Sequence, residues 1–266
     1  MFEATSPTVV LVHGAFADAS SWSGVIERLQ AKCVPVKAPA NPLRGISTDS
    51  DYIAGVFEET PGPVLAVGHS YGGATIANAA TDAENVVGLV FVAAFAPEED
   101  EALGEAEANS KDSVLNSALV PLHYPAGNGD EPAVEFAIDQ ARFKDAFAAD
   151  LPAEEAAVMA ATQRPVAELA FSERSGPPAW KSLPSWAIVA TGDKAAGADV
   201  VRSMAERAEA TITEVDGSHV IMISQPDAVT EVISTALEAV AKTAADLPAP
   251  RRPQEETARQ TSVPTS

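Results

Sequence analysis

Residues 64–77 read VLAVGHSYGGATIA, and they place Ser70 between two glycines where an apolar run gives way to an Ala-rich segment. The apolar run is typical of a buried strand, and the segment after Ser70 has the composition of a helix. A Gly-x-Ser-x-Gly pattern in that setting indicates a nucleophile on a sharp turn, where glycine lets strand and helix approach closely. The pattern alone also fits an ordinary bend, so its meaning depends on partners elsewhere in the chain.

A serine hydroxyl becomes a nucleophile when a histidine accepts its proton and a carboxylate orients that histidine. His219 follows the last expected strand and precedes the last expected helix, which brings it to the same edge of a parallel sheet as Ser70. Asp193 follows the strand before that one, and the resulting order Ser, Asp, His is the order this architecture requires. The other histidines lie on the first loop, beside the serine and in a helical region; they are His13, His69 and His123.

Other carboxylates remain alternatives to Asp193 as the acid. One begins an expected helix as a cap, one is close to His219 along its loop, and two follow an earlier strand. These residues are Asp199, Asp216, Glu98 and Glu99.

Apolar strand-like runs alternate with helix-like segments over most of the chain, which predicts an α/β fold with a doubly wound, mostly parallel sheet. The expected strands lie within residues 8–14, 33–39, 63–70, 86–95, 185–193 and 210–219. The expected helices span residues 19–31, 48–59, 71–83, 199–208 and 227–242.

The alternation stops between residues 98 and 181, where Ala and Glu dominate and apolar residues recur at helical spacing. We expect a helical lid there, inserted before the acid-bearing strand and lying over the edge at which open α/β sheets bind ligands. Residues 1–97 and 182–242 then form the core. Residues 243–266 are rich in Pro, Thr and Gln, which predicts a disordered tail.

Composition limits the classes of partner. Of the 266 residues 46% are hydrophobic, which is enough material for one large core. A net charge of -21 repels phosphate backbones and anionic membranes, so we expect no nucleic-acid and no membrane partner.

The lone cysteine, Cys33, begins a strand-like run and is expected in the core. The N-terminus has no basic leader and no stretch is long enough to cross a bilayer, which predicts a cytoplasmic protein.

The remaining candidate residues would stabilise and surround a reacting carbonyl group. An oxyanion needs backbone N–H donors, and those of Ala15 and Tyr71 lie on the loop after the first strand and directly after Ser70. Candidate walls of a substrate pocket are the large side chains of that loop, of the sheet edge and of the lid. They are Phe16, Trp22, Phe95, His123, Tyr124 and Met159.

Four segments resemble the α/β-hydrolase superfamily, and within it the small esterases similar to plant methyl esterases and bacterial pyrethroid-hydrolase-like proteins. They read VLVHGAFADASSW, GHSYGG, AWKSLPSWAIVATGDKA and MAERAEATITEVDGSHVIMISQPDAV. The resemblance implies a serine esterase with Ser70 as nucleophile, Asp193 as acid, His219 as base and the amides of Ala15 and Tyr71 as oxyanion hole. It also implies an acyl-enzyme intermediate and neither metal nor organic cofactor. The candidate pocket walls indicate an apolar ester of small to medium size.

Related chemistries on the same fold are separated by single residues. Haloalkane dehalogenases and epoxide hydrolases, which this chain also resembles, use a carboxylate nucleophile at the position of Ser70. Hydroxynitrile lyases have threonine at the position of Gly14 and lysine at the position of Val220. A cofactor-free haloperoxidase or perhydrolase with the same triad stays open, as does a ligand-binding protein with little turnover. The natural substrate and the oligomeric state are not determined by the sequence.

Overall fold

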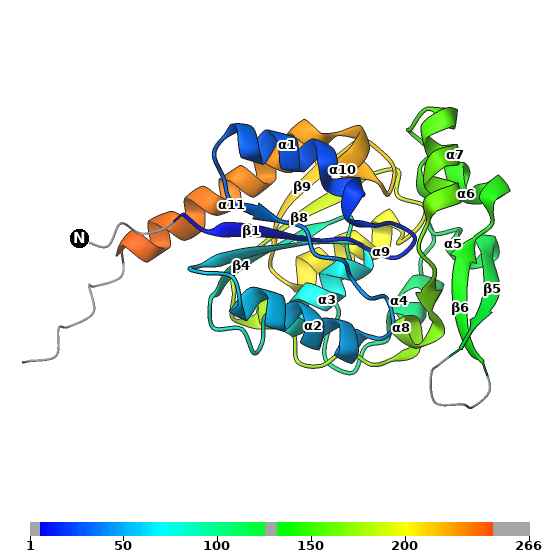
Figure 1. Ribbon diagram of the computed structural model, residues 1–266, viewed down its shortest axis with the longest axis horizontal. Coiled ribbons are helices and arrows are strands. Elements are labelled where there is room, and N and C mark those ends of the chain that lie inside the picture. The colour runs from blue at the N-terminus through cyan, green and yellow to red at the C-terminus, as the bar shows by residue number, and fades with distance from the viewer. Residues whose placement is uncertain (1–5, 126–131, 247–266) are drawn as a thin grey trace, which may run out of the picture.

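The computed structural model describes residues 6–125 and 132–246, and a parallel sheet forms its centre (Figure 1). The strand order is β2-β1-β3-β4-β8-β9, and every pairing in it is parallel. The strands are β1 (Thr8–Val12), β2 (Val36–Lys37), β3 (Val64–His69), β4 (Val86–Val92), β8 (Ser185–Ala190) and β9 (Thr211–Val215). The predicted doubly wound parallel sheet is therefore confirmed.

The strand order reverses beside β1, because the chain goes first to β2 on one side and then to β3 on the other. Open α/β sheets bind ligands at the carboxyl ends of the strands flanking such a reversal. The loop after β1 and the turn after β3 meet there.

Helices cover both faces of the sheet, α1 and α11 on one and α2 and α3 on the other (Figure 1). Continuous apolar strands need this double cover, and β3 is buried along its whole length. The helices of the core are η1 (Ala19–Trp22), α1 (Ser23–Ala31), α2 (Ile46–Glu58), α3 (Tyr71–Ala79), α9 (Ala198–Arg207), α10 (Ile221–Ser224) and α11 (Pro226–Asp246).

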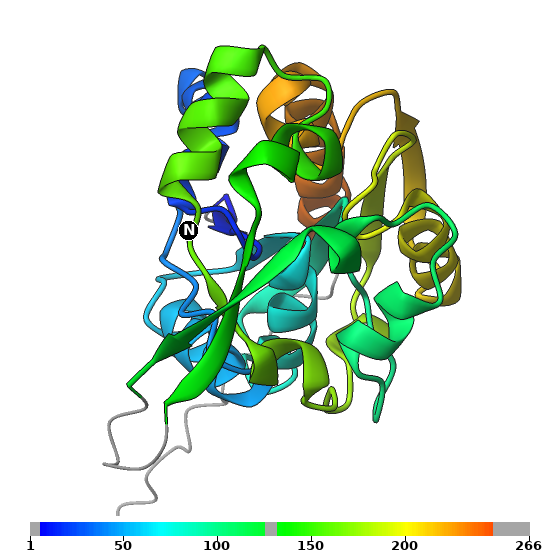
Figure 2. The same cartoon turned by 90° about the vertical axis from the view of Figure 1, so that its right-hand side faces the viewer.

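The segment 98–181, hereafter the insertion, lies between β4 and β8 at the carboxyl edge of the sheet (Figure 2). The prediction that it is helical throughout is wrong, because it also contains an antiparallel sheet of order β5-β6-β7. Strand β5 is mostly exposed, and β6 is only partly buried except at Ile138, so neither has the continuous burial of the central strands. Its elements are α4 (Leu103–Ala108), α5 (Leu115–Ala118), β5 (Leu119–Tyr124), β6 (Ala133–Ile138), α6 (Gln140–Phe147), α7 (Ala153–Thr162), β7 (Val166–Ala167), α8 (Glu168–Ser172) and η2 (Ala179–Lys181).

Two smaller predictions also need correction. Cys33 is exposed rather than in the core, because it occupies a left-handed turn (φ 58°) after α1, and β2 begins only at Val36. Helix α11 continues to Asp246, past the predicted boundary at residue 242, and residues 247–266 of the predicted tail lie outside the described residues. No helix within residues 6–125 and 132–246 is long and apolar enough to cross a membrane.

Candidate active site

Ser70 lies on the turn between β3 and α3, with φ 53° and ψ -123°. This left-handed backbone is strained for a residue with a side chain, and such strain concentrates at functional sites. The flanking glycines are required by space: a Cβ on Gly68 would lie 2.5 Å from the carbonyl oxygen of Gly72, and one on Gly72 would lie 2.4 Å from that of Val12. Glycine at positions 68 and 72 therefore allows the close packing that holds Ser70 in this conformation.

His219 and Asp193 are joined by a hydrogen bond of 2.8 Å between Nδ1 and Oδ2. The second carboxylate oxygen, Oδ1, accepts the N–H groups of Ala195 and Ala196 at 2.8 and 3.1 Å. Both partners are 1% exposed. Because an ionised carboxylate only accepts hydrogen bonds, Nδ1 carries the proton and Nε2 keeps its lone pair.

The alternative acids have other partners. The carboxylate of Asp199 accepts a hydrogen bond from the Lys111 N–H, and that of Asp216 accepts one from the Thr191 hydroxyl. Glu98 forms an ion pair with Lys181, and the Glu99 N–H donates to the Glu98 carboxylate. Among these residues the geometry therefore pairs His219 with Asp193.

The Ser70 turn and the His219 loop touch through His69. Its Nε2–H donates to the carbonyl oxygen of His219 at 3.0 Å, and the two imidazole rings lie 4.7 Å apart. The Ser70 hydroxyl has no hydrogen-bond partner within the described residues, and Ser70 keeps 6% exposure. Hydrogen bonds of catalytic groups are often incomplete before substrate binds.

His69 is neutral in this environment. Burial, followed by the neighbouring His219, holds its pKa well below the usual range. A neutral ring with Nε2 protonated adds no positive charge beside His219, the predicted base.

The loop after β1 is held by His13. Its Nδ1–H donates to the Gly14 carbonyl at 2.9 Å, while its Nε2 accepts the Asn41 N–H, also at 2.9 Å. Burial lowers the pKa of His13, which keeps it neutral. A Cβ on Gly14 would lie 2.6 Å from that of Ser70, so this loop approaches the serine closely.

Three phenylalanine rings cover the site. The ring of Phe147, at the end of α6, lies 4.9 Å from that of His219. Phe16 packs edge-on against Phe147 at 6.1 Å and stacks with Phe171 at 6.4 Å. Phe16 has a left-handed backbone (φ 59°), and its N–H donates to the Arg164 carbonyl of the insertion at 3.1 Å.

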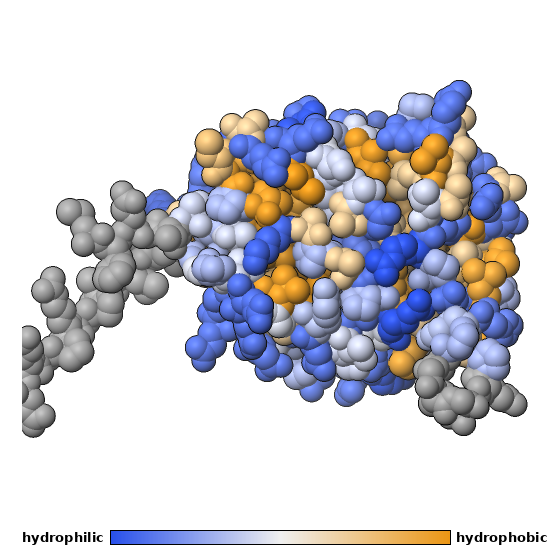
Figure 3. All heavy atoms as spheres, in the orientation of Figure 1, coloured by the Kyte–Doolittle hydropathy of each residue, from blue (hydrophilic) through white to orange (hydrophobic). Residues whose placement is uncertain are grey.

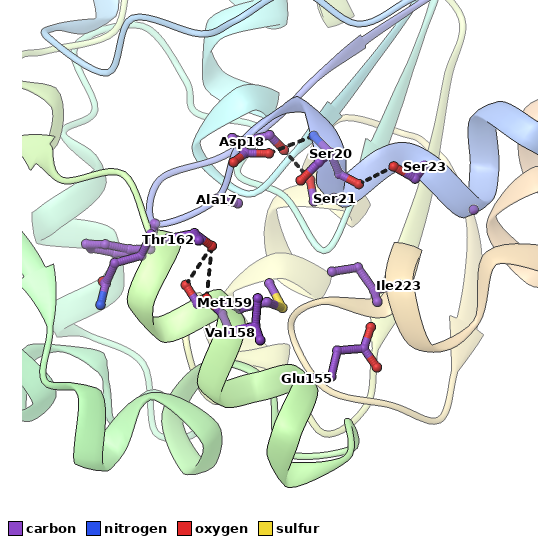
Figure 4. A pocket seen from close by; sticks show the side chains of 13 residues that line it. Ala17, Asp18, Ser20, Ser21, Ser23, Glu155, Val158, Met159, Thr162 and Ile223 are labelled. Carbon is purple, nitrogen blue, oxygen red and sulfur yellow. Dashed lines mark hydrogen bonds between the residues drawn. The ribbon is translucent and has the colours of Figure 1, made fainter.

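A cavity of about 390 Å³ opens beside this cover, between η1 and α7 (Figure 4). Its apolar wall includes Phe16, Val158, Met159 and Ile223, and Asp18 and Glu155 contribute carboxylates. Ser70 and His219 are not among its lining residues. The cavity thus does not reach the serine, and Phe16 belongs both to its wall and to the group of rings at His219.

Of the six predicted pocket residues, Phe16 and Met159 line this cavity and the other four lie elsewhere. Trp22 is fully buried with its ring edge-on to His69. The Phe95 N–H donates to the Ser70 carbonyl at 3.2 Å. His123 and Tyr124 lie on β5, where the Arg44 guanidinium is 4.5 Å from the centre of the Tyr124 ring.

Three residues near the base had no role in the sequence analysis: His69, Phe147 and Asp150. The position of His69 beside Ser70 could have suggested a contact with the base, because the two loops share an edge. Phe147 and Asp150 belong to the insertion, and no local pattern shows which part of the core they reach.

Comparison with known proteins agrees with this architecture. Residues 9–232 match the model of a family described as "Alpha/beta hydrolase family". Among solved structures, polyneuridine aldehyde esterase is 21% identical with a TM-score of 0.72, over 89% of this chain and 100% of that one. A pyrethroid hydrolase from Sphingobium faniae JZ-2 is 19% identical with a TM-score of 0.69, over 90% and 100%.

Tomato methylketone synthase I is 22% identical with a TM-score of 0.69, over 90% of this chain and 99% of that one. At these identities the likeness establishes the fold, and proteins with different names share it. No curated protein matches the sequence.

Proposed function

Because this chain belongs to the alpha/beta hydrolase family, we propose that it is a serine hydrolase that cleaves small to medium carboxylic esters through an acyl-enzyme. The observation that carries the proposal is the buried hydrogen bond between His219 and Asp193, on loops that meet the strained turn of Ser70. Family and fold support a hydrolase, and the arrangement of these three residues supports the serine mechanism.

In the proposed mechanism Ser70 Oγ attacks the carbonyl carbon of the ester while His219 Nε2 accepts the hydroxyl proton. Asp193 keeps the imidazole in the required tautomer and stabilises its positive charge. His219 then donates that proton to the departing alkoxide, which leaves as the alcohol. Water, deprotonated by His219, attacks the acyl-enzyme; the bond from the acyl carbon to Ser70 Oγ then breaks, His219 returns the proton to Oγ, and the carboxylic acid leaves.

The tetrahedral oxyanion of each step is assigned to the amides of Ala15 and Tyr71. Neither N–H donates to a backbone acceptor in the described part of the chain, so both remain free to donate to substrate. One such donor lowers the activation barrier by about 3–4 kcal/mol. Gly14 leaves no space for a side chain beside Ser70, which argues against a further side-chain donor at that position.

The cavity beside Phe16 is the proposed site for part of the substrate. Its volume of about 390 Å³ suits a small molecule, and its largely apolar wall favours an apolar group. Phe16 lines the cavity and contacts Phe147, whose ring packs on His219, so we propose that these two rings move to admit substrate to Ser70.

A fluorophosphonate probe tests the proposal without knowledge of the substrate. We expect covalent labelling of Ser70, found by peptide mass mapping, and its loss in Ser70→Ala. Ser234→Ala is a matched control, because its hydroxyl donates to Thr230 on α11, away from the site. Undiminished labelling of Ser70→Ala protein would show that another residue reacts.

Parallel assays separate the remaining functions. Hydrolysis of p-nitrophenyl acetate that rises with pH as the imidazole loses its proton supports the esterase. Bromination that depends on hydrogen peroxide and acetate supports the perhydrolase. A ligand-binding protein would show neither activity, and its Tm would rise only with its ligand.

A further inference from the structure

The loop that carries His219 is held by a carboxylate of the insertion. Asp150 lies between α6 and α7, and its Oδ2 accepts the Ser218 N–H at 2.9 Å. Its Oδ1 accepts the Ser218 hydroxyl. Ser218 is 4% exposed and immediately precedes His219, so this carboxylate binds the backbone beside the proposed base.

Asp150 is itself firmly placed. Lys144, on α6, donates from Nζ to the carbonyl oxygens of Ala149 and Leu151 on either side of it, the former at 3.0 Å. The Leu151 N–H donates to the Ala148 carbonyl at 3.1 Å, and Leu151 is 5% exposed. The turn that presents the carboxylate is therefore fixed at both ends.

The His219 loop is shaped to receive this carboxylate. A Cβ on Gly217 would lie 2.9 Å from Asp150 Oδ2 and 2.4 Å from the Cδ1 of Ile221. Burial raises the pKa of Asp150, but the hydrogen bonds from Ser218 outweigh that effect and leave it lowered, so the group is ionised at neutral pH.

We propose that Asp150 is a positioning residue: it holds the Gly217–His219 loop so that the His219 imidazole, hydrogen-bonded to Asp193, stays beside the Ser70 turn. This inference rests on the proposed serine-hydrolase function. It assigns the insertion a second contribution besides covering the site, because α6 and the turn after it bring the Phe147 ring onto His219 and the Asp150 carboxylate onto the adjacent Ser218.

The test compares Asp150→Ala, Asp150→Asn and Ser218→Ala in the full chain, with p-nitrophenyl acetate and a fluorophosphonate as probes. Loosening the base loop should lower kcat of Asp150→Ala about 10- to 100-fold with KM almost unchanged, because misplacement by about 1 Å has effects of that size. Labelling of Ser70 should slow by the same factor. Asp139→Asn is the matched control: this carboxylate of the insertion caps α6 through the Ala141 N–H and does not touch the base loop.

The two conservative variants keep the test decisive even if Asp150→Ala fails to fold. Asp150→Asn still accepts the Ser218 N–H, so its kcat should fall less than about 3-fold. Ser218→Ala loses one of the two hydrogen bonds to Asp150, so its kcat should fall about 2- to 10-fold. The pH midpoint of kcat should stay the same in Asp150→Asn, since the groups facing His219 directly are Asp193 and His69.

Each outcome decides a separate question. Wild-type protein that no fluorophosphonate labels at Ser70 refutes the proposed function itself. Normal labelling of wild type together with wild-type rates in Asp150→Ala refutes only the positioning role, and so do wild-type rates in Ser218→Ala if Asp150→Ala does not fold. A loss in Asp150→Asn as deep as in Asp150→Ala, with a displaced pH midpoint, would show that Asp150 acts through its charge.

Discussion

Tyr71 links the strained serine turn to helix α2. It follows Ser70 directly, and its buried hydroxyl donates to Oδ2 of Asp49 at 2.8 Å. Asp49 also accepts the Arg44 N–H with both oxygens. Burial raises the pKa of Asp49 and raises that of Tyr71 well above its usual value. The hydrogen bond therefore joins a buried carboxylate to the residue whose amide is assigned to the oxyanion.

Tyr71→Phe removes this hydrogen bond and leaves the Asp49 carboxylate one partner short. We expect a loss of about 1–3 kcal/mol in the free energy of unfolding, a fall in Tm of about 2–10 °C. The hydroxyl favours the ionised form of Asp49, so the loss is largest at neutral pH and shrinks as pH falls through the raised pKa of Asp49. Thermal unfolding at several pH values measures it. Tyr52→Phe, at an exposed position of α2, is the control, and an equal loss in both variants contradicts the prediction.

Sequence order alone selected Asp193 and His219, because loops that follow parallel strands emerge at one edge of the sheet. The contacts of His219 with Phe147 and of the neighbouring Ser218 with Asp150 were not predictable, since they depend on how the insertion docks. Cys33 was misplaced because an apolar neighbourhood in sequence does not reveal a left-handed turn.

At the scale of elements, polar contacts tie the insertion to the core at several places, and one of them is the segment around Leu43 and Arg44. The Ala167 N–H of β7 donates to the Leu43 carbonyl at 2.9 Å. Next along the chain, Arg44 pairs with Glu135 of β6 at 2.7 Å and lies over the Tyr124 ring of β5. Arg44 thus contacts both strands of the hairpin whose existence the sequence did not reveal.

Arg44→Ala should loosen this hairpin with little effect on the rest of the fold. The ion pair is partly exposed, so we expect a loss of no more than about 1 kcal/mol in global stability. Amide hydrogens of β5 and β6 should exchange faster, which hydrogen-exchange mass spectrometry measures by segment. Arg202→Ala removes an ion pair of equal length, to Glu214 on β9, and should leave exchange in the hairpin unchanged. Unchanged exchange in Arg44→Ala would show that the hairpin is held by its apolar contacts.

The central strands and the hairpin strands differed in predictability for a physical reason. Strands β3 and β8 are each buried along their whole length, so each is visible in the sequence as an apolar run. Strand β5 is mostly exposed and β7 has two residues, so their pairing is decided by contacts with distant segments. Because apolar residues recur at helical spacing elsewhere in the insertion, the sequence analysis predicted helices and no hairpin there.

The whole molecule combines one hydrophobic core with a surface of strongly negative charge. The core runs from β1 through α11 and includes parts of the insertion, such as Phe143 and Phe147. Hydrophilic residues spread over the face seen in Figure 3, with apolar patches between them. With 38 acidic and 17 basic residues, most carboxylates have no basic partner available to them. Repulsion among them opposes folding at neutral pH.

Salt should therefore stabilise this protein. Raising NaCl from about 0.01 to 0.15 M shortens the screening length from about 30 to 8 Å and weakens repulsion between distant carboxylates. The ion pairs on exposed side chains, such as Arg28 with Asp227, contribute little that screening could remove. We expect Tm at pH 7 to rise with NaCl, and equally with KCl, because screening depends on ionic strength. A fall in Tm would mean that local attractions outweigh the net charge of -21, and a rise with only one of the salts would indicate binding of that cation.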